Sequence, residues 1–358
     1  MAITIKPYPQ PNPSFPKSKT RFATDNNGTL GPVMPTYRPK DFSYDPSTRT
    51  GVFTIKKQEA VITDRPIAPY IPSQEIIELI RLAQILQRPV LIKGEPGSGK
   101  TQLAKALAYE WYGNEYRDHF FEWQIKSTAK AIDGLYTFDH VGRLRDANIA
   151  SRSDKTSNEI FQYRTFGPMG RAFLTSTQAD PSILLIDEID KADIDFPNDL
   201  LLELDERRFV IPETGEVIEA RYPPVIFITS NDERELPEAF LRRCLFMYIK
   251  FPETADLKRI IDAHLPGILT RHGQLVDKAI DAFNVLREEI RRDPSDNKRV
   301  STSELLDWLR AYKFDLEADD NSRKAAQETI GSLEKLPRYY QALLKTYPAV
   351  LRQQKKVL

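Results

Sequence analysis

A glycine-rich octet at residues 94–101, with the sequence GEPGSGKT, constrains this chain more than any other feature. It fits the pattern G-x-x-x-x-G-K-[ST], in which backbone N–H groups curl around phosphate oxygens at the start of a helix. The expected context is present, because an apolar run at residues 90–92 precedes the octet and apolar side chains recur at helical spacing over residues 101–111. The sequence therefore predicts a strand, a phosphate-binding loop and a helix in this order.

Further apolar runs predict the sheet to which this unit belongs. Four more strands are expected, at residues 120–125, 183–186, 225–228 and 247–251. Continuous apolar strands that alternate with helices are typical of a parallel sheet covered on both faces. After Pro252 the strands end, and helices are expected at residues 254–264, 275–291, 303–312, 322–333 and 339–354. The predicted fold class is therefore α/β: a P-loop NTPase parallel sheet with helices on both faces, followed by a small all-helical domain.

The composition excludes several other classes of protein. The 358 residues include 51 basic and 51 acidic side chains, so the formal net charge is zero, whereas a duplex-DNA binder usually carries a basic excess. A single cysteine, Cys244, excludes an internal disulfide framework and a cysteine-cluster zinc site. No apolar run approaches the roughly 18 residues of a membrane span, and residues 1–13 contain no signal-peptide stretch. We therefore predict a cytoplasmic protein that does not contact the membrane.

Proline content separates the first segment from the rest. The first 48 residues hold nine prolines and few apolar clusters, so they cannot bury enough surface to offset the entropy of ordering. Three parts are predicted on this basis. Residues 1–72 form a proline-rich extended arm, residues 73–252 the α/β domain, and residues 253–358 the helical domain with a C-terminal helix.

Two acids follow the strand predicted at residues 183–186. The carboxyl end of such a strand lies beside the phosphate loop in this type of sheet, which favours a joint site over simple capping of the next helix. We expect Asp187 to hold Mg²⁺ through water and Glu188 to orient and polarise an attacking water. In the loop, Lys100 would reach the β- and γ-phosphates and the Thr101 hydroxyl would ligate Mg²⁺. The full set of predicted nucleotide contacts is Gly94, Glu95, Pro96, Gly97, Ser98, Gly99, Lys100, Thr101 and Gln102.

Polar residues also follow the strand predicted at residues 225–228. Asn231 is the candidate to hydrogen-bond the water or the γ-phosphate, with Thr229 as the fallback and a turn-forming asparagine as the structural alternative. Further along, Arg242 and Arg243 stand side by side before the last strand. They form a solvated turn, or they act on a nucleotide bound by a neighbouring subunit, where an arginine neutralises transition-state charge.

This ordered set of motifs resembles the AAA+ ATPases, and most closely their MoxR group. The matching phrases cover roughly residues 73–312: GEPGSGKT, FGPMGRAFL, ILLIDEIDKAD, LLLELDERRFVIPETGE, FITSNDERELPEAFLRRC and STSELLDWLRA. The resemblance implies an AAA+ core with a helical lid, assembled into a ring of identical subunits, commonly a hexamer, with ATP and Mg²⁺ between subunits. It also implies that Lys100 and Thr101 are the Walker A residues, that Asp187 and Glu188 are the Walker B pair, and that Asn231 is the sensor.

The resemblance also ranks the arginines and shows one departure. In MoxR relatives the arginine finger directly precedes the position of Cys244, which favours Arg243, with Arg242 as the alternative or a helper. The arginine that relatives place at the start of a lid helix aligns with Ser303 here, and Lys298 and Arg299 are the nearby candidates to replace it.

Two segments match the inserts of the same group. Residues 126–165 correspond to a helix-two insert, and residues 209–221 are expected to form a β-hairpin that turns at residues 214–215. In relatives such loops line the pore or one face of the ring, and the alternative is surface decoration. The residues most expected to contact a partner are Tyr136, Phe138 and Arg143.

The predicted function is ATP hydrolysis that drives the remodelling or activation of a partner protein, a chaperone-like role. Family habit suggests a partner with a von Willebrand A-type domain. Two alternatives stay open. The first is a nucleic-acid-directed motor or clamp loader, which the neutral net charge disfavours. The second is a nucleotide-gated scaffold with slow turnover.

Overall fold

The computed structural model of the chain describes residues 22–24, 30–32, 67–149, 157–292, 300–318, 320–330 and 338–355. Of the predicted arm, it therefore describes only residues 67–72 and one short antiparallel pair, β1 (Phe22–Thr24) with β2 (Leu30–Pro32). Lys298 and Arg299, the candidates to replace a lid arginine, lie outside the described residues.

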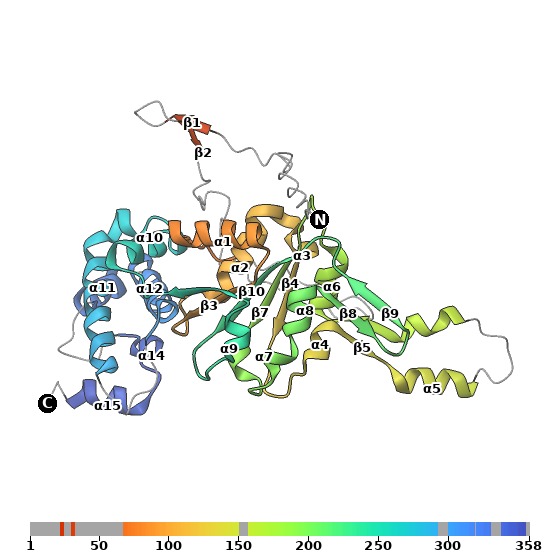
Figure 1. The fold of residues 1–358 in the computed structure, drawn as a ribbon. Helices are drawn as coiled ribbons and strands as arrows, with labels where there is room; N and C mark the ends of the chain where they lie inside the picture. Colours follow the sequence, from red (N-terminus) through yellow and green to blue (C-terminus); the bar gives the residue numbers. More distant parts are fainter. Residues whose placement is uncertain are drawn as a thin grey trace.

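A five-stranded parallel sheet forms the centre of the larger domain (Figure 1). Its order across the sheet is β11 (Leu245–Ile249), β3 (Val90–Gly94), β10 (Val225–Ser230), β7 (Ile183–Asp187) and β4 (Phe120–Gln124). All four neighbouring pairs run parallel, so the carboxyl ends of the strands share one edge. Each strand predicted from an apolar run is present, although β11 begins two residues before the expected Met247.

Helices cover both faces of this sheet, as the apolar strands require. In β7 the side chains of Ile183 and Leu185 pack with α1 (Gln74–Leu86) and α2 (Lys100–Tyr112). Its other two apolar residues, Leu184 and Ile186, belong to the core on the opposite face. That core includes residues of α4 (Ala131–Leu135), α6 (Pro168–Thr175), α7 (Phe196–Asp199), α8 (Leu201–Glu206) and α9 (Glu238–Leu241).

Two small antiparallel units extend this domain. The segment predicted as an insert contains β5 (Tyr136–Phe138), α5 (His140–Ile149), a 3₁₀ turn at Ser157–Tyr163 and β6 (Arg164–Phe166), with β5 paired to β6. Figure 1 shows α5 projecting from the body on the side opposite the helical domain. The predicted hairpin is present as β8 (Arg208–Ile211) and β9 (Glu216–Glu219), and Gly215 takes the left-handed conformation in its turn.

The C-terminal part of the described chain is helical. It comprises α10 (Thr254–His264), α11 (Ile268–Arg291), α12 (Thr302–Glu317), α13 (Asp320–Thr329), α14 (Tyr340–Leu343) and α15 (Tyr347–Lys355), around a core that includes Phe283, Trp308 and Tyr312. The predicted fold class is confirmed. None of the described helices combines the length and the hydropathy that a membrane span requires.

The largest differences from the predicted helices concern α11 and the last predicted helix. α11 begins at Ile268 rather than at residue 275, because it continues through a non-helical residue, His272. The single helix expected at residues 339–354 is instead two, α14 and α15. Pro348 lies in the first turn of α15, where its missing N–H costs nothing, and it could not have stood in the middle of one long helix.

Candidate nucleotide-binding site

The glycine-rich loop connects β3 to α2 and is shaped by two glycines. Gly97 and Gly99 have φ angles of 74° and 89°, a left-handed conformation that favours glycine. Gly99 also lies under the ring of Tyr70, which a Cβ at that position would meet at 3.1 Å. Within the loop, the Ser98 Oγ is buried and has no hydrogen-bond partner in the part of the chain that the structure describes. Helix α2 begins directly after Gly99, so the backbone N–H groups of its first turn point at the loop and favour binding of an anion there.

Lys100 folds back over the loop. Its Nζ donates to the carbonyl oxygens of Gly94, at 2.8 Å, and Glu95, at 3.0 Å. Burial lowers the pKa of the Lys100 ammonium, and the opposing effect comes from four carboxylates, those of Asp190, Asp187, Glu188 and Glu95. The loop and the strand edge beside it therefore place one buried cation among several acids, and that cation already makes the kind of oxygen contact that a phosphate would provide.

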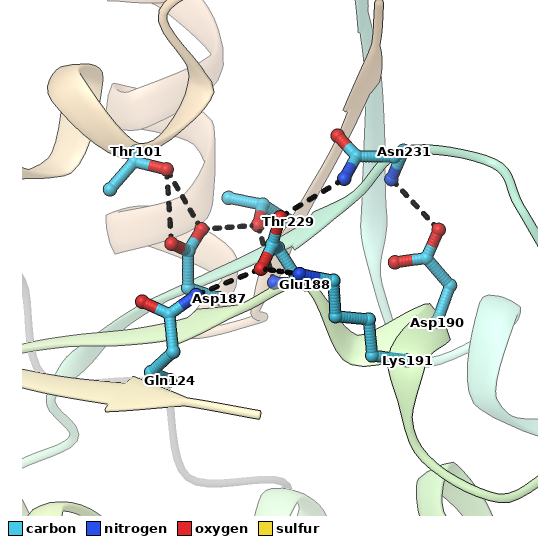
Figure 2. A network of polar contacts seen from close by, with 8 residues as sticks. All are labelled: Thr101, Gln124, Asp187, Glu188, Asp190, Lys191, Thr229 and Asn231. Atoms are coloured by element: carbon cyan, nitrogen blue, oxygen red, sulfur yellow. Dashed lines mark hydrogen bonds and ion pairs between the residues drawn. The ribbon is translucent and has the colours of Figure 1, made fainter. Parts of the chain in front are cut away.

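The predicted metal ligands lie in contact with each other (Figure 2). The Thr101 hydroxyl donates to the two Asp187 carboxylate oxygens, at 2.9 and 3.1 Å. Thr229, on the neighbouring strand β10, donates to the same carboxylate at 2.6 Å and accepts from the Glu188 N–H at 2.8 Å. Thr229 is fully buried. Its hydroxyl thus joins the two acids, a role different from the fallback suggested by the sequence.

Glu188 is held by three donors. Its carboxylate accepts from Gln124 at 2.8 Å, from Asn231 at 3.2 Å and from Lys191 at 2.5 Å (Figure 2). Its backbone is left-handed, with φ 60° and ψ 51°, which turns the chain directly after β7. Burial acts to raise the pKa of Glu188, but the hydrogen bond and charge of Lys191, with the two amide hydrogen bonds, hold it below the usual value. The carboxylate is therefore ionised at neutral pH.

Asp190 fixes the turn that carries Asn231. Its Oδ2 accepts from the backbone N–H of Asn231 at 2.9 Å and from that of Glu233 at 3.0 Å. The side chain is 2% exposed, and its second oxygen has no hydrogen-bond partner among the described residues. Asp190 thus sets the position of an amide that contacts Glu188.

The helical domain reaches the loop from the other side. Ser301, the N-cap of α12, lies so close to Gly97 that a Cβ on the glycine would overlap its side chain. The nearby Ser303 hydroxyl is 3.4 Å from that Cβ position. From α11, Arg287 forms an ion pair with Glu95 of the loop.

A cavity of about 480 Å³ opens beside the loop, between the two domains. It is lined by residues 68–73, by residues 97–99 of the loop, by the end of β11 with the connector that follows it (residues 247–253) and by the start of α12. Gln102 lines it as well, and its amide donates to the carbonyl oxygen of Ala68 at 2.7 Å. The size and the mixed apolar and polar lining suit a small organic ligand.

The two arginines lie away from this loop. Arg243 pairs with Asp205 at 2.5 Å, and Arg242 pairs with Glu238. Both precede β11, whose first residue pairs with Val90 at the start of β3, whereas the loop follows the end of β3. The arginines and the loop are thus separated by about the length of a strand, roughly 16 Å.

The structure therefore brings together five of the residues predicted from sequence. Figure 2 shows four of them, Thr101, Asp187, Glu188 and Asn231. The fifth is Lys100, whose ammonium lies close enough to Asp187 and Glu188 for their charges to act on its pKa. Of the other predicted contacts, Gly94 ends β3, residues 95–99 form the loop, with Pro96 exposed, and Gln102 lies in the first turn of α2. The sequence reasoning missed four contributors: Gln124, Asp190, Lys191 and Arg287. Lys191 had a signal, because it stands three residues after Glu188, a spacing at which the 3₁₀ turn Ile189–Lys191 brings the two side chains together.

In comparison with known proteins, part of the chain matches the model of a protein family. Residues 89–244 match the family model described as AAA domain (dynein-related subfamily). No curated protein matches the chain. Among solved structures, a crystal structure of a candidate ATPase from Cytophaga hutchinsonii is 12% identical, with a TM-score of 0.35, and the match covers 77% of this chain and 84% of that one. The matched residues 89–244 contain the phosphate loop and four of the five strands of the sheet.

Proposed function

We propose that this protein, whose residues 89–244 form an AAA domain, is a MoxR-type ATP hydrolase that remodels or activates a partner protein in the cytoplasm. One observation carries the hydrolysis. The buried ammonium of Lys100, the paired Thr101 and Asp187, and the ionised Glu188 meet at one edge of the sheet, beside a loop with the backbone of a phosphate cradle.

The residues at this edge fit Mg²⁺. Thr101 and Asp187 offer hydroxyl and carboxylate oxygens, which Mg²⁺ prefers, and the described residues contain no cluster of three or more metal-ligating side chains. A site with one or two protein ligands is what Mg²⁺ uses when substrate phosphates and water complete its shell. Thr101 and Asp187 would hold the ion, and its charge would offset the negative charge that develops on the phosphates during hydrolysis.

Each side chain then has a defined task. Lys100 exchanges two loop carbonyl oxygens for phosphate oxygens. Glu188 accepts a proton from the water that attacks the γ-phosphate, which requires it to exchange at least one of its three present donors for that water. Asn231 stays beside Glu188 and holds the water in line.

The cavity next to the loop supports a nucleoside site. Tyr70 presents a ring at its wall, and burial together with Arg310 lowers the pKa of His264, so that this ring is neutral at pH 7. Adenine as the base follows from the family resemblance. Because the cavity lies between the two domains, base binding would also fix the position of the helical domain.

The proposed assembly is a ring, commonly a hexamer, with ATP between subunits. The placement of Arg243 and Arg242 far from their own loop supports a role at a neighbour's site. The proposed partner contact is the projecting insert, where α5 exposes Val141 (66%) and Leu144 (65%). A von Willebrand A-type domain is the partner that the resemblance suggests.

The insert residues named from sequence divide into two groups. Arg143 is exposed and Phe138 is half-buried, so both remain candidates for a partner contact. Tyr136 is 3% exposed, and its hydroxyl donates to Glu213 of the hairpin at 2.9 Å. It holds the insert against the hairpin and does not face a partner.

The test is Glu188→Gln. We expect ATP hydrolysis to fall by about 100-fold or more, the usual scale for loss of a general base, while the ATP dissociation constant changes less than about threefold. Glu233→Gln is the matched control, because Glu233 is an exposed acid on the neighbouring turn and should leave turnover unchanged. Wild-type hydrolysis by Glu188→Gln would contradict the proposal. The same variant, loaded with ATP, should retain the partner protein in a pull-down.

A further inference from the structure

An ion pair joins the two domains at the phosphate loop. Arg287 lies on α11 of the helical domain, and its Nη2 donates to the Glu95 carboxylate, 192 positions away in the sequence. The arginine is 8% exposed and the side chain of Glu95 is 17% exposed. The pair is thus largely shielded from water, where an ion pair is coupled far more strongly than at the surface.

Packing holds the guanidinium in place. Its central carbon lies 3.7 Å from the centre of the Phe251 ring, in the connector between β11 and α10, and Phe251 in turn packs against Phe283 of α11. The Nε of Arg287 is buried and has no hydrogen-bond partner among the described residues. Such an arginine is a costly choice for simple packing, since an apolar side chain would fill the same space without an unsatisfied donor.

Glu95 explains why a cation is needed at this point. It is the second residue of the loop, and its charge is one of the four that act on the Lys100 ammonium. A carboxylate so close to Lys100 attracts that cation, and it also repels any phosphate that Lys100 is to bind. The loop therefore carries a charge that opposes its own ligand, unless a second cation compensates it.

We infer that Arg287 is a positioning residue that neutralises Glu95, so that the affinity of the loop for nucleoside di- and triphosphates depends on docking of the helical domain. The inference rests on the proposed function, because it concerns the same phosphate site. It assigns the arginine to α11, a different helix from α12, where Ser303 stands in place of the family's arginine. Ser301 makes the neighbouring contact with Gly97, but it brings no charge.

The test is a double-mutant cycle in the full-length chain. ATP and ADP dissociation constants are measured by calorimetry for Arg287→Gln, for Glu95→Gln and for the double variant. We expect Arg287→Gln to weaken the binding of both nucleotides about tenfold or more, because the buried cation that pairs with the Glu95 carboxylate is removed. Glu95→Gln gives the affinity of a loop without this charge, and the double variant should stay within about threefold of Glu95→Gln, since removal of the acid removes the need for the arginine.

Two further variants separate this effect from damage to the fold. Arg287→Lys keeps the charge but loses the planar group that stacks on Phe251, so it should recover part of the affinity that Arg287→Gln loses. Arg271→Gln is the matched control, because Arg271 lies on the same helix but pairs with Glu317 inside the helical domain, and it should not change nucleotide affinity. Thermal unfolding of each nucleotide-free variant verifies that it is folded.

Two results would overturn the inference. The first is an Arg287→Gln variant that is folded and binds ATP as the wild type does. The second is a double variant as weak as Arg287→Gln, which would make the arginine a mechanical link rather than a neutralising charge. Both differ from failure of the proposed function, in which the wild-type chain itself would bind no ATP.

Discussion

Thr229 shows, at the scale of one residue, how a buried hydroxyl orders two acids. It donates to Asp187 and accepts from the Glu188 N–H, and no part of it reaches solvent. Thr229→Val keeps the shape of the side chain but removes its hydroxyl. The Glu188 N–H is then left without this acceptor, and the Asp187 carboxylate loses one donor. We expect the free energy of unfolding to fall by about 1–3 kcal/mol, measured by urea denaturation. Thr229→Ser retains the hydroxyl and should recover most of the loss; equal stability of Thr229→Val and the wild type would contradict the role.

The contact between Lys191 and Glu188 predicts a pH dependence. The pKa of Glu188 lies below its ordinary value of 4.5, so the unfolded chain binds the proton more readily than the folded chain. The contact therefore stabilises the fold above pH 4.5, and this stabilisation is lost as the pH falls through the lowered pKa. Lys191→Met should be less stable than the wild type at neutral pH, and the difference should vanish in acid.

Urea titrations over a pH series measure this difference in the free energy of unfolding. Lys191→Arg, which keeps the cation, is the control and should follow the wild-type profile. A stability difference that is independent of pH would assign Lys191 a packing role only.

At this scale the sequence predicted the residues that follow a strand and missed those that depend on register. Asp187 and Glu188 follow the apolar run of β7, and Asn231 follows the last residue of β10, so the parallel sheet alone brings them to one edge. Gln124 reaches Glu188 because β4 pairs with β7 in a register that sets Gln124 opposite Asp187. Arg287 reaches Glu95 only through the docking of two domains. Neither the register of two paired strands nor the docking of two domains can be predicted from a local sequence pattern.

Among the elements, α4 and α6 meet unusually closely at the base of the insert. A Cβ on Gly170 of α6 would overlap the Leu135 carbonyl oxygen at the end of α4. Gly170→Ala should therefore lower the free energy of unfolding by about 1–3 kcal/mol, in spite of the better helix propensity of alanine, because backbone must move to admit the methyl group. The loss is measured by urea denaturation of the full chain.

Gly273 provides the matched control for this prediction. It lies in α11, and a Cβ there would meet nothing within 4 Å. Gly273→Ala should be neutral or stabilising by up to about 1 kcal/mol. If the two alanine variants shift stability alike, helix propensity rather than close packing governs Gly170.

At the scale of elements, sequence patterns predicted the strands of the main sheet but not every helix boundary or the strand pair of the insert. The central strands β7 and β10 were predictable because each is a run buried at every residue, and the edge strands β4 and β11 because apolar and aromatic residues dominate them. The division of residues 339–354 into α14 and α15 was signalled only by Pro348, since the apolar spacing continues through the break. The antiparallel pair of β5 and β6 spans an insert of low periodicity, so no local signal announced it.

For the molecule as a whole, the class of fold follows from the order of strands and helices, whereas the relation of its domains does not. The helical domain touches the loop through Ser301 and Arg287 and forms one wall of the cavity. The sequence around Arg287 is typical of an amphipathic helix, and the sequence around Ser301 is typical of a helix N-cap, so neither indicates a contact with the loop. A site that lies between two hydrophobic cores thus cannot be predicted from the pattern of any single segment, although each core by itself can be.

The largest-scale prediction concerns how subunits complete each other's sites. Arg243 lies about a strand's length from the loop of its own chain, so in the proposed ring it serves the ATP of the next subunit. An Arg243→Ala subunit keeps its loop, and a Lys100→Ala subunit keeps its arginine. Each variant alone should hydrolyse almost no ATP, because every interface lacks one half of the site.

Mixing the two variants restores complete sites. In rings reassembled at random from equal amounts, about a quarter of interfaces join an intact loop to an intact arginine, so the mixture should recover up to about a quarter of wild-type turnover per subunit. Asp205→Ala removes the partner of Arg243 but keeps the arginine, and it controls for disruption of the local ion pair. A mixture that assembles yet stays as inactive as its parents would show that Arg243 does not act across the interface. The same mixture can be made with Arg242→Ala in place of Arg243→Ala. If only that mixture regains turnover, Arg242 is the arginine that acts across the interface, because a subunit can be rescued only by a partner that supplies the group it lacks.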